Sequence, residues 1–192
     1  MQTTPISVEL YNSCSTSSPK KSTIFSFIAW GRAAALEMID GRAAALAAER
    51  LGVPVPVAGP WLLLIELAGD TDLTEQLADA LDGTDLAGEP AVGVDAAAQQ
   101  RLWQVRESTA EVVGLFGPPL KFDVSLPLSV IPAFAADAAG LVGEHAPEAI
   151  PILFGHIGEG NLHLNVLRCG AEQEHHLYAA MMKLIAAHGG NV

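Results

Sequence analysis

The chain of 192 residues is poor in cysteine, with only Cys14 and Cys169, which lie far apart. Two distant cysteines make neither the disulfide framework of a small secreted domain nor the close spacing of a zinc-binding cysteine motif. A reducing compartment is the simpler interpretation, and we predict a cytoplasmic location.

Long apolar segments are also missing. The run from Ile24 to Trp30 follows Lys20 and Lys21, as in a signal peptide. It is too short and too interrupted by polar residues for a membrane span, and it begins late for a secretory signal. The sequence therefore predicts no transmembrane segment.

Basic residues are scarce, because 10 Lys and Arg stand against 22 Asp and Glu, for a formal net charge of -12. This balance repels nucleic-acid phosphates and anionic lipid surfaces, so neither is an expected partner. Half of the residues are hydrophobic, which is enough for a packed globular core. If the ligand is anionic, the few basic residues must be concentrated where it binds.

The first part of the chain differs from the rest. Ser and Thr crowd positions 3–23, together with Pro5, Asn12 and Pro19, and residues 1–32 predict a poorly defined leader. From Ala33 to about Gly52, alanines with apolar residues at helical spacing predict one helix. The prolines of residues 53–60 predict an extended connector.

Strands and helices alternate irregularly over the remaining residues. Apolar runs and alternating patterns predict strands at residues 61–67, 121–126, 150–154 and 162–167. Capping and stop residues predict helices from Thr71 or Asp72 to Gly83, Asp95 to Gly117, Ser129 to Gly143 and Glu172 to His188, with a loop over residues 88–93. This order favours an α+β fold, an antiparallel sheet with helices packed on one face.

The strongest local feature is residues 154–165, Phe-Gly-His-Ile-Gly-Glu-Gly-Asn-Leu-His-Leu-Asn. In a strand, His163 and Asn165 share one face, and the apolar Leu162, Leu164 and Val166 share the other. The three glycines permit a sharp turn that brings His156 back towards His163. Two imidazoles, completed by a carboxylate, suit a divalent transition metal that keeps open positions.

Other interpretations of this stretch remain open. Two histidines at this separation also occur without a metal, and the glycines alone indicate only a turn. A phosphate-binding glycine loop is disfavoured, since a dinucleotide fingerprint opens a helix and this loop leads into a strand. A metal-dependent hydrolase would need a third ligand, and no residue has a convincing spacing for it.

The motif Gly-His-x-Gly-(Asp/Glu)-Gly-Asn-Leu-His resembles the signature of the C-terminal domain of FAD-linked oxidases. This family includes D-2-hydroxyglutarate dehydrogenases, D-lactate dehydrogenases and the glycolate oxidase flavoprotein subunit. The resemblance covers residues 33–192 and is strongest to the 2-hydroxyglutarate branch. It extends to four further segments in the family's order, Leu36–Asp40, Leu63–Leu67, Leu102–Glu107 and Lys121–Pro127. It implies a ferredoxin-like duplicated substrate and metal domain.

The resemblance also implies roles for individual residues. His156 and His163 match the family's metal ligands, with zinc or manganese as the expected ion. Arg106, Lys121 and Asn165 match residues that hold the substrate, a small anionic 2-hydroxy acid. The cofactor that the resemblance implies is FAD, which would accept the hydride.

Three further motif residues, Gly158, Gly160 and Asn161, are expected to contact the cofactor. Two positions depart from the family's pattern. A threonine four residues after the arginine is Ala110 here, and the motif acid, more often aspartate, is Glu159.

The chemistry of a 2-hydroxy acid agrees with these roles. Oxidation removes a hydride from the α-carbon and a proton from the hydroxyl, and a metal can orient both oxygens. Arg106 offers a bidentate fork for a carboxylate and Lys121 a compact charge. Each residue also has a structural interpretation: an ion-paired helix arginine, a polar edge lysine and, for Asn165, an amide that satisfies backbone groups.

The sequence ends at Val192, before the family's Ser-x-Glu-His-Gly segment. In the family that segment supplies a carboxylate ligand and the proton acceptor, so we expect no catalytic base in this chain. The FAD-binding domain is also expected to be absent, and a separate chain that carries it is an expected partner. By itself this fragment should bind flavin poorly and turn over nothing. The alternative is an inactive remnant or an interaction subunit.

Overall fold

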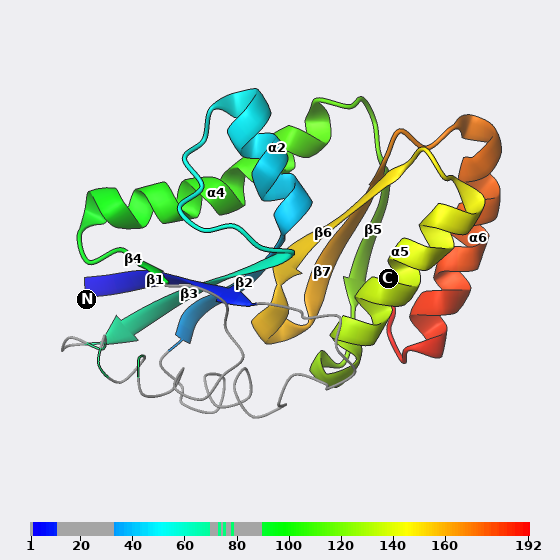
Figure 1. Cartoon of the computed structure of the whole chain (residues 1–192). Helices are drawn as coiled ribbons and strands as arrows, with labels where there is room; N and C mark the ends of the chain where they lie inside the picture. Colours follow the sequence, from blue (N-terminus) through cyan, green and yellow to red (C-terminus); the bar gives the residue numbers. More distant parts are fainter. Residues whose placement is uncertain (1, 11–32, 70–72, 74, 76–77, 79–89) are drawn as a thin grey trace. The chain divides into compact units, whose positions relative to one another are not determined.

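The computed structural model describes the backbone of residues 2–10 and residues 33–69, 73, 75, 78 and 90–192 in full. The chain divides into two compact units, Met1–Ser108 and Thr109–Val192. Each unit combines an antiparallel sheet with helices, as Figure 1 shows. The helix predicted from Thr71 or Asp72 to Gly83 falls largely outside the described residues.

The first unit contains four strands, β1 (Gln2–Leu10), β2 (Ala33–Asp40), β3 (Trp61–Gly69) and β4 (Ala91–Val92). Their order in the sheet is β4-β1-β3-β2, and every neighbouring pair is antiparallel. Helix α2 (Gly41–Leu51) and most of helix α4 (Ala96–Gly114) lie on one side of these strands (Figure 1). Strand β1 falls within the expected leader, the rest of which lies outside the described residues.

The prediction of a single helix from Ala33 to Gly52 is wrong in its first half. Residues 33–40 form β2, which pairs with β3 along its length and is buried from Leu36 onward. The helix starts only at Gly41, where the Asp40 carboxylate accepts a hydrogen bond of 2.8 Å from the Arg42 backbone N–H. Pairing with an apolar strand outweighs the helix propensity of the alanines.

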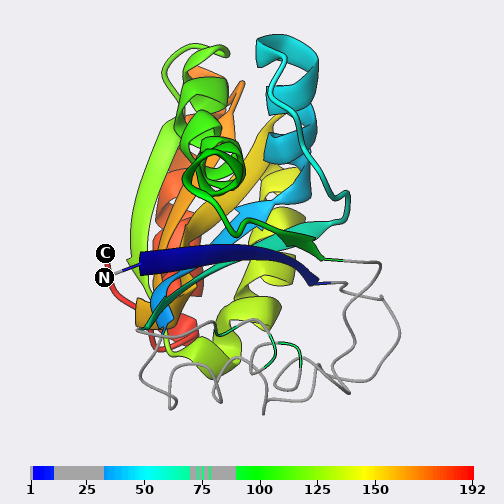
Figure 2. The ribbon, with the colours of Figure 1, turned by 90° about the vertical axis from the view of Figure 1, so that its left-hand side faces the viewer.

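The second unit contains three strands, β5 (Leu120–Ser125), β6 (Ile150–His156) and β7 (Asn161–Leu167), in the order β6-β7-β5. Helices α5 (Ile131–His145) and α6 (Ala171–Ala187) contact each other and cover one face of this sheet, as Figures 1 and 2 show. Side chains from both layers form the core, including Phe122, Leu162, Leu164, Phe134, Leu177 and Met181. The predicted α+β architecture, with helices on one sheet face, is confirmed.

Most other predicted elements are confirmed within one to three residues of their bounds. Asp95 caps α4 by accepting a hydrogen bond of 2.8 Å from the Ala98 backbone N–H. Ala91–Val92, which the sequence placed in a loop, forms a short strand beside β1. Within the described residues, no helix combines the length and the hydropathy of a membrane span.

The two units share one strand order. The first three strands of the first unit lie as β1-β3-β2, and the three strands of the second lie as β5-β7-β6. In each unit, the third strand along the chain therefore lies between the first and the second. This shared strand order agrees with the expected ferredoxin-like duplication, but in the first unit α2 lies between β2 and β3, where a βαββαβ unit has a hairpin.

Candidate functional site

The motif stretch forms a tight hairpin in the second unit. Strands β6 and β7 pair with Phe154 opposite His163, and a single 3-10 turn (Ile157–Glu159) joins them. Gly160 ends the turn with a φ of 72°, in the left-handed region. A Cβ at Gly155, whose φ is 147°, would lie 2.6 Å from the Asn161 carbonyl oxygen. The predicted role of these glycines in the turn is confirmed.

The hairpin brings the two motif histidines together. The ring centroids of His156 and His163 lie 6.0 Å apart, at an interplanar angle of 80°. With metal–nitrogen bonds of about 2.0–2.1 Å, each ring centroid of a bound histidine lies roughly 3 Å from the ion. The observed separation is therefore near the upper limit for two rings that share one ion. Across the described ranges, no cluster of three or more His, Cys, Asp or Glu suitable for a metal occurs.

His163 also has a carboxylate neighbour that sequence analysis did not identify. Its Nδ1 lies 2.6 Å from Oδ1 of Asp123, which stands directly opposite it on β5. The Phe154 ring, opposite on β6, lies 5.3 Å from the His163 ring between centroids. The alternation of β5 placed Asp123 on the face of Lys121, but the register between β5 and β7 was needed to find this contact.

Two predicted substrate residues join this group. Lys121 on β5 stands directly opposite Asn165 on β7, and cross-strand partners share a sheet face. Asn165 is buried, and Lys121 is exposed. We call the side chains of Lys121, Asp123, His156, His163 and Asn165 the polar face.

The chemistry of the polar face follows from its side chains. It carries one ammonium group, one carboxylate, one amide and two imidazoles, and the opposite face of the sheet packs under α5 and α6. The Asn165 amide is buried, and its Nδ2 donates a hydrogen bond of 3.5 Å to the His163 carbonyl oxygen. A carboxylate can bind the ammonium group through a charge-assisted hydrogen bond. An adjacent hydroxyl can bind the amide.

Arg106 lies in the first unit, on α4. Its Nε donates a hydrogen bond of 2.6 Å to Oε2 of Glu37 on β2, and the two side chains are only 12% and 3% exposed. The structural interpretation of Arg106 as an ion-paired helix residue is therefore confirmed, and its role in substrate binding stays a prediction. Sequence analysis missed Glu37, because residues 33–40 were assigned to a helix.

The residues expected to contact the cofactor lie at the hairpin turn. Gly158 is within the 3-10 turn, Gly160 ends it and Asn161 begins β7. The Leu126 backbone N–H donates a hydrogen bond of 2.9 Å to the Gly160 carbonyl oxygen, which ties the turn to the end of β5. Their role in cofactor binding stays a prediction.

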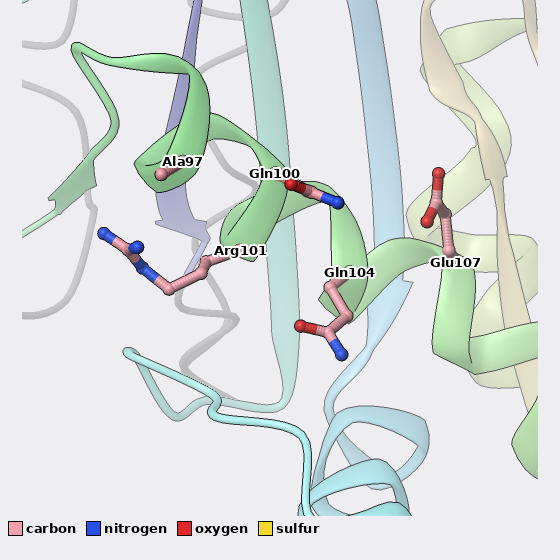
Figure 3. Close-up of a pocket in the computed structure, with 5 residues that line it drawn as sticks. All are labelled: Ala97, Gln100, Arg101, Gln104 and Glu107. Carbon is pink, nitrogen blue, oxygen red and sulfur yellow. The ribbon is translucent and has the colours of Figure 1, made fainter.

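The surface pocket on α4 and the Cys169 thiol are not candidate functional sites. A surface pocket of about 420 Å³ lies along α4, and Figure 3 shows that all five lining side chains come from this helix, Ala97, Gln100, Arg101, Gln104 and Glu107. None of these is a predicted site residue. Burial, together with the Glu174 charge, raises the pKa of the Cys169 thiol, so this cysteine is not an activated nucleophile.

Curated relatives of the chain are named D-2-hydroxyglutarate dehydrogenase. The protein of Stutzerimonas stutzeri is 34% identical over 140 residues, which are 70% of this chain and 30% of that protein. The protein of Xanthomonas citri pv. viticola is 36% identical over 66% of this chain and 28% of its own length. The mitochondrial protein of Bos taurus is 31% identical over 69% and 25%. The chain thus spans less than a third of the length of these relatives.

Two solved structures of other proteins share the fold. A 4-ethylphenol oxidase from Gulosibacter chungangensis, in complex with isoeugenol, matches all of this chain and 45% of its own with a TM-score of 0.60 and 13% identity. A p-cresol methylhydroxylase with bound substrate matches all of this chain and 44% of its own, with a TM-score of 0.62 and 12% identity. At such low identity the likeness concerns the fold alone.

The whole sequence beyond its first residues agrees with one family model. Residues 23–192 match the model for the C-terminal domain of FAD-linked oxidases. This range contains both histidines of the hairpin, the polar face and the Glu37–Arg106 ion pair. The chain therefore belongs to the FAD-linked oxidase C-terminal domain family.

Proposed function

We propose that this chain is the substrate-binding part of an FAD-dependent dehydrogenase that oxidises a D-2-hydroxy acid to the 2-oxo acid. The observation that carries the proposal is the polar face, where Lys121 and Asn165 stand opposite each other beside the two histidines. The names of the relatives support a substrate of the 2-hydroxyglutarate type, and lactate and glycolate are chemically similar alternatives.

Electrostatics supports an anionic ligand at this position. In a chain with a formal net charge of -12, the exposed Lys121 ammonium group is a local positive charge on the polar face. The nearby Asp123 carboxylate contacts the His163 ring, so it has a partner other than Lys121. A substrate carboxylate can therefore pair with Lys121 while its hydroxyl binds Asn165.

The proposal includes a metal and a flavin. His156 and His163 would hold a divalent ion such as zinc or manganese, which supplies Lewis acidity to the carboxylate and hydroxyl oxygens of the substrate. FAD, when bound, supplies the hydride acceptor that no side chain offers. The family and its relatives support FAD as the cofactor. In this proposal most of the flavin would be held by a separate chain or by sequence beyond residues 1–192.

Removal of the Lys121 charge tests the substrate assignment. Lys121→Ala should weaken binding of D-2-hydroxyglutarate about 10-fold or more, because a hydrogen bond to a charged group contributes about 1.5–3 kcal/mol. The affinity is measured by NMR titration of the purified chain in the presence of zinc. Lys183→Ala, at an exposed position of α6, is the control and should bind like the unmodified chain. Equal affinities for the two variants would contradict the assignment.

The histidine pair is tested by equilibrium dialysis with zinc and with manganese. The double variant His156→Ala, His163→Ala should lose the weak binding of the unmodified chain, because both imidazole ligands are gone. His175 and His176 on α6 provide a matched control, since their ring centroids also lie 6.0 Å apart. Zinc binding that survives in the first variant and disappears in the His175→Ala, His176→Ala variant would reject the hairpin site.

A further inference from the structure

We propose that Asp123 is a positioning residue that fixes the tautomer and the orientation of the His163 ring, so that Nε2 is the nitrogen offered to a ligand. The effect on the ring concerns the protein alone. The consequence for metal binding rests on the proposed function.

The first step of the argument is the proton on Nδ1. The 2.6 Å between Nδ1 of His163 and Oδ1 of Asp123 is within hydrogen-bond distance. An ionised carboxylate can only accept a hydrogen bond, so Nδ1 must carry the hydrogen of this contact. A neutral imidazole has one N–H, and Nε2 then carries the lone pair that a metal or a hydroxyl proton requires.

The second step is the confinement of the ring. Asp123 and Phe154 stand opposite His163 on the two strands that flank β7. The carboxylate contacts one ring nitrogen, and the Phe154 ring lies 5.3 Å away between centroids. The ring is therefore held between β5 and β6. Histidines that ligate metals commonly donate their other N–H to a carboxylate in this way.

The third step separates positioning from packing. The Asp123 side chain is 76% exposed, so it fills no space in the core. Exposed charge pairs contribute little to stability. Loss of the carboxylate should therefore alter the state of the His163 ring in a protein that still folds normally.

A second carboxylate–imidazole pair in the same unit has the opposite arrangement. Oδ2 of Asp137 on α5 lies 2.9 Å from Nε2 of His188, at the end of α6. By the same reasoning, His188 should carry its hydrogen on Nε2 and His163 should carry its hydrogen on Nδ1. The two histidines thus provide internal standards for each other.

The test is long-range proton–nitrogen NMR of the metal-free chain in alkaline buffer, where imidazole side chains are mostly neutral. In the unmodified chain, His163 should be the Nδ1–H tautomer. In Asp123→Ala it should shift towards Nε2–H, the form that neutral histidine prefers in water, while His188 stays unchanged. Asp123→Asn, which keeps an acceptor oxygen without the charge, should lie between the two. Asp137→Ala is the matched control and should alter only His188.

Zinc affinity gives the second measurement. Asp123→Ala should bind zinc about 10–100-fold more weakly than the unmodified chain, as expected for loss of a carboxylate partner of a ligand histidine. An unchanged His163 tautomer in Asp123→Ala would overturn the proposal whatever the zinc affinity. A shifted tautomer in a protein whose unmodified form binds no zinc would support the positioning role and refute the proposed metal site.

Discussion

Replacement of Glu37 by alanine is expected to lower the free energy of unfolding by about 3–5 kcal/mol, the typical cost of breaking a buried ion pair. The substitution removes the carboxylate that the Arg106 guanidinium contacts at 2.6 Å, at a position where both side chains are almost inaccessible to water. Urea unfolding, followed by circular dichroism, measures the change.

A surface pair on α2 provides the control for Glu37. Arg50 and Glu49 lie 3.1 Å apart, but their side chains are 54% and 63% exposed. Solvent screens such a pair, so Glu49→Ala should change the stability by a few tenths of a kcal/mol at most. If Glu37→Ala costs no more than Glu49→Ala, the buried pair does not stabilise the first unit.

Replacement of both partners of the buried pair sharpens the test. In the Glu37→Met, Arg106→Met variant neither partner of the pair leaves a buried charge behind, and most of the lost stability should return. A double variant as unstable as Glu37→Ala would mean that packing, and not the charge of Arg106, accounts for the loss.

The second large effect is expected at the hairpin turn. Gly160→Ala should lower the free energy of unfolding by about 2–5 kcal/mol, since a left-handed residue with a side chain costs about 1–2 kcal/mol and overpacking adds about 1–3 kcal/mol. The φ of Gly160 is 72°, and a Cβ there would overlap the Leu126 carbonyl oxygen. NMR spectra should also show displaced resonances for His156 and His163, because the turn sets their separation.

Gly52 offers a control that distinguishes the cost of the left-handed conformation from the cost of overlap with Leu126. It ends α2 with a φ of 69°, almost the same as that of Gly160, but a Cβ at Gly52 would meet nothing within 4 Å. Gly52→Ala should therefore cost only the left-handed conformation, about 1–2 kcal/mol. Equal losses for the two variants would show that contact with Leu126 is not what requires a glycine in the motif.

The sequence predicts the fold best where local pattern and tertiary environment agree. The alternation of Lys121 to Leu126 and the glycines between β6 and β7 gave the second unit nearly as it is observed. The prediction for residues 33–40 failed because Leu36–Asp40 are buried on both faces of the strand, and neither they nor the three alanines before them show a strand's alternating pattern. Its identity as a strand depends on pairing with β3, which no local signal reveals.

For the candidate site too, local pattern predicted some contacts, and others depend on the folded structure. The convergence of His156 and His163 followed from the hairpin, and the shared face of His163 and Asn165 followed from strand geometry. Asp123 and Glu37 were missed, because each partner pair joins distant elements. The Glu37–Arg106 contact joins residues 69 positions apart in the sequence, and only the folded structure brings them together.

The register of β5 against β7 also has a consequence for the order in which the polar face assembles during folding. His156 and His163 belong to one hairpin, whose short loop closes at little entropic cost and on a fast timescale. The contact between Asp123 and His163 joins residues 40 positions apart. It forms only when β5 pairs with β7, and α5 and β6 lie between these two strands in the sequence. Closing a long loop costs more conformational entropy than closing a short one, and proteins rich in contacts between distant residues fold more slowly. The two imidazoles are therefore expected to meet early in folding. The Nδ1–H tautomer of His163 is favoured only once β5 has paired with β7 and completed the sheet of the second unit.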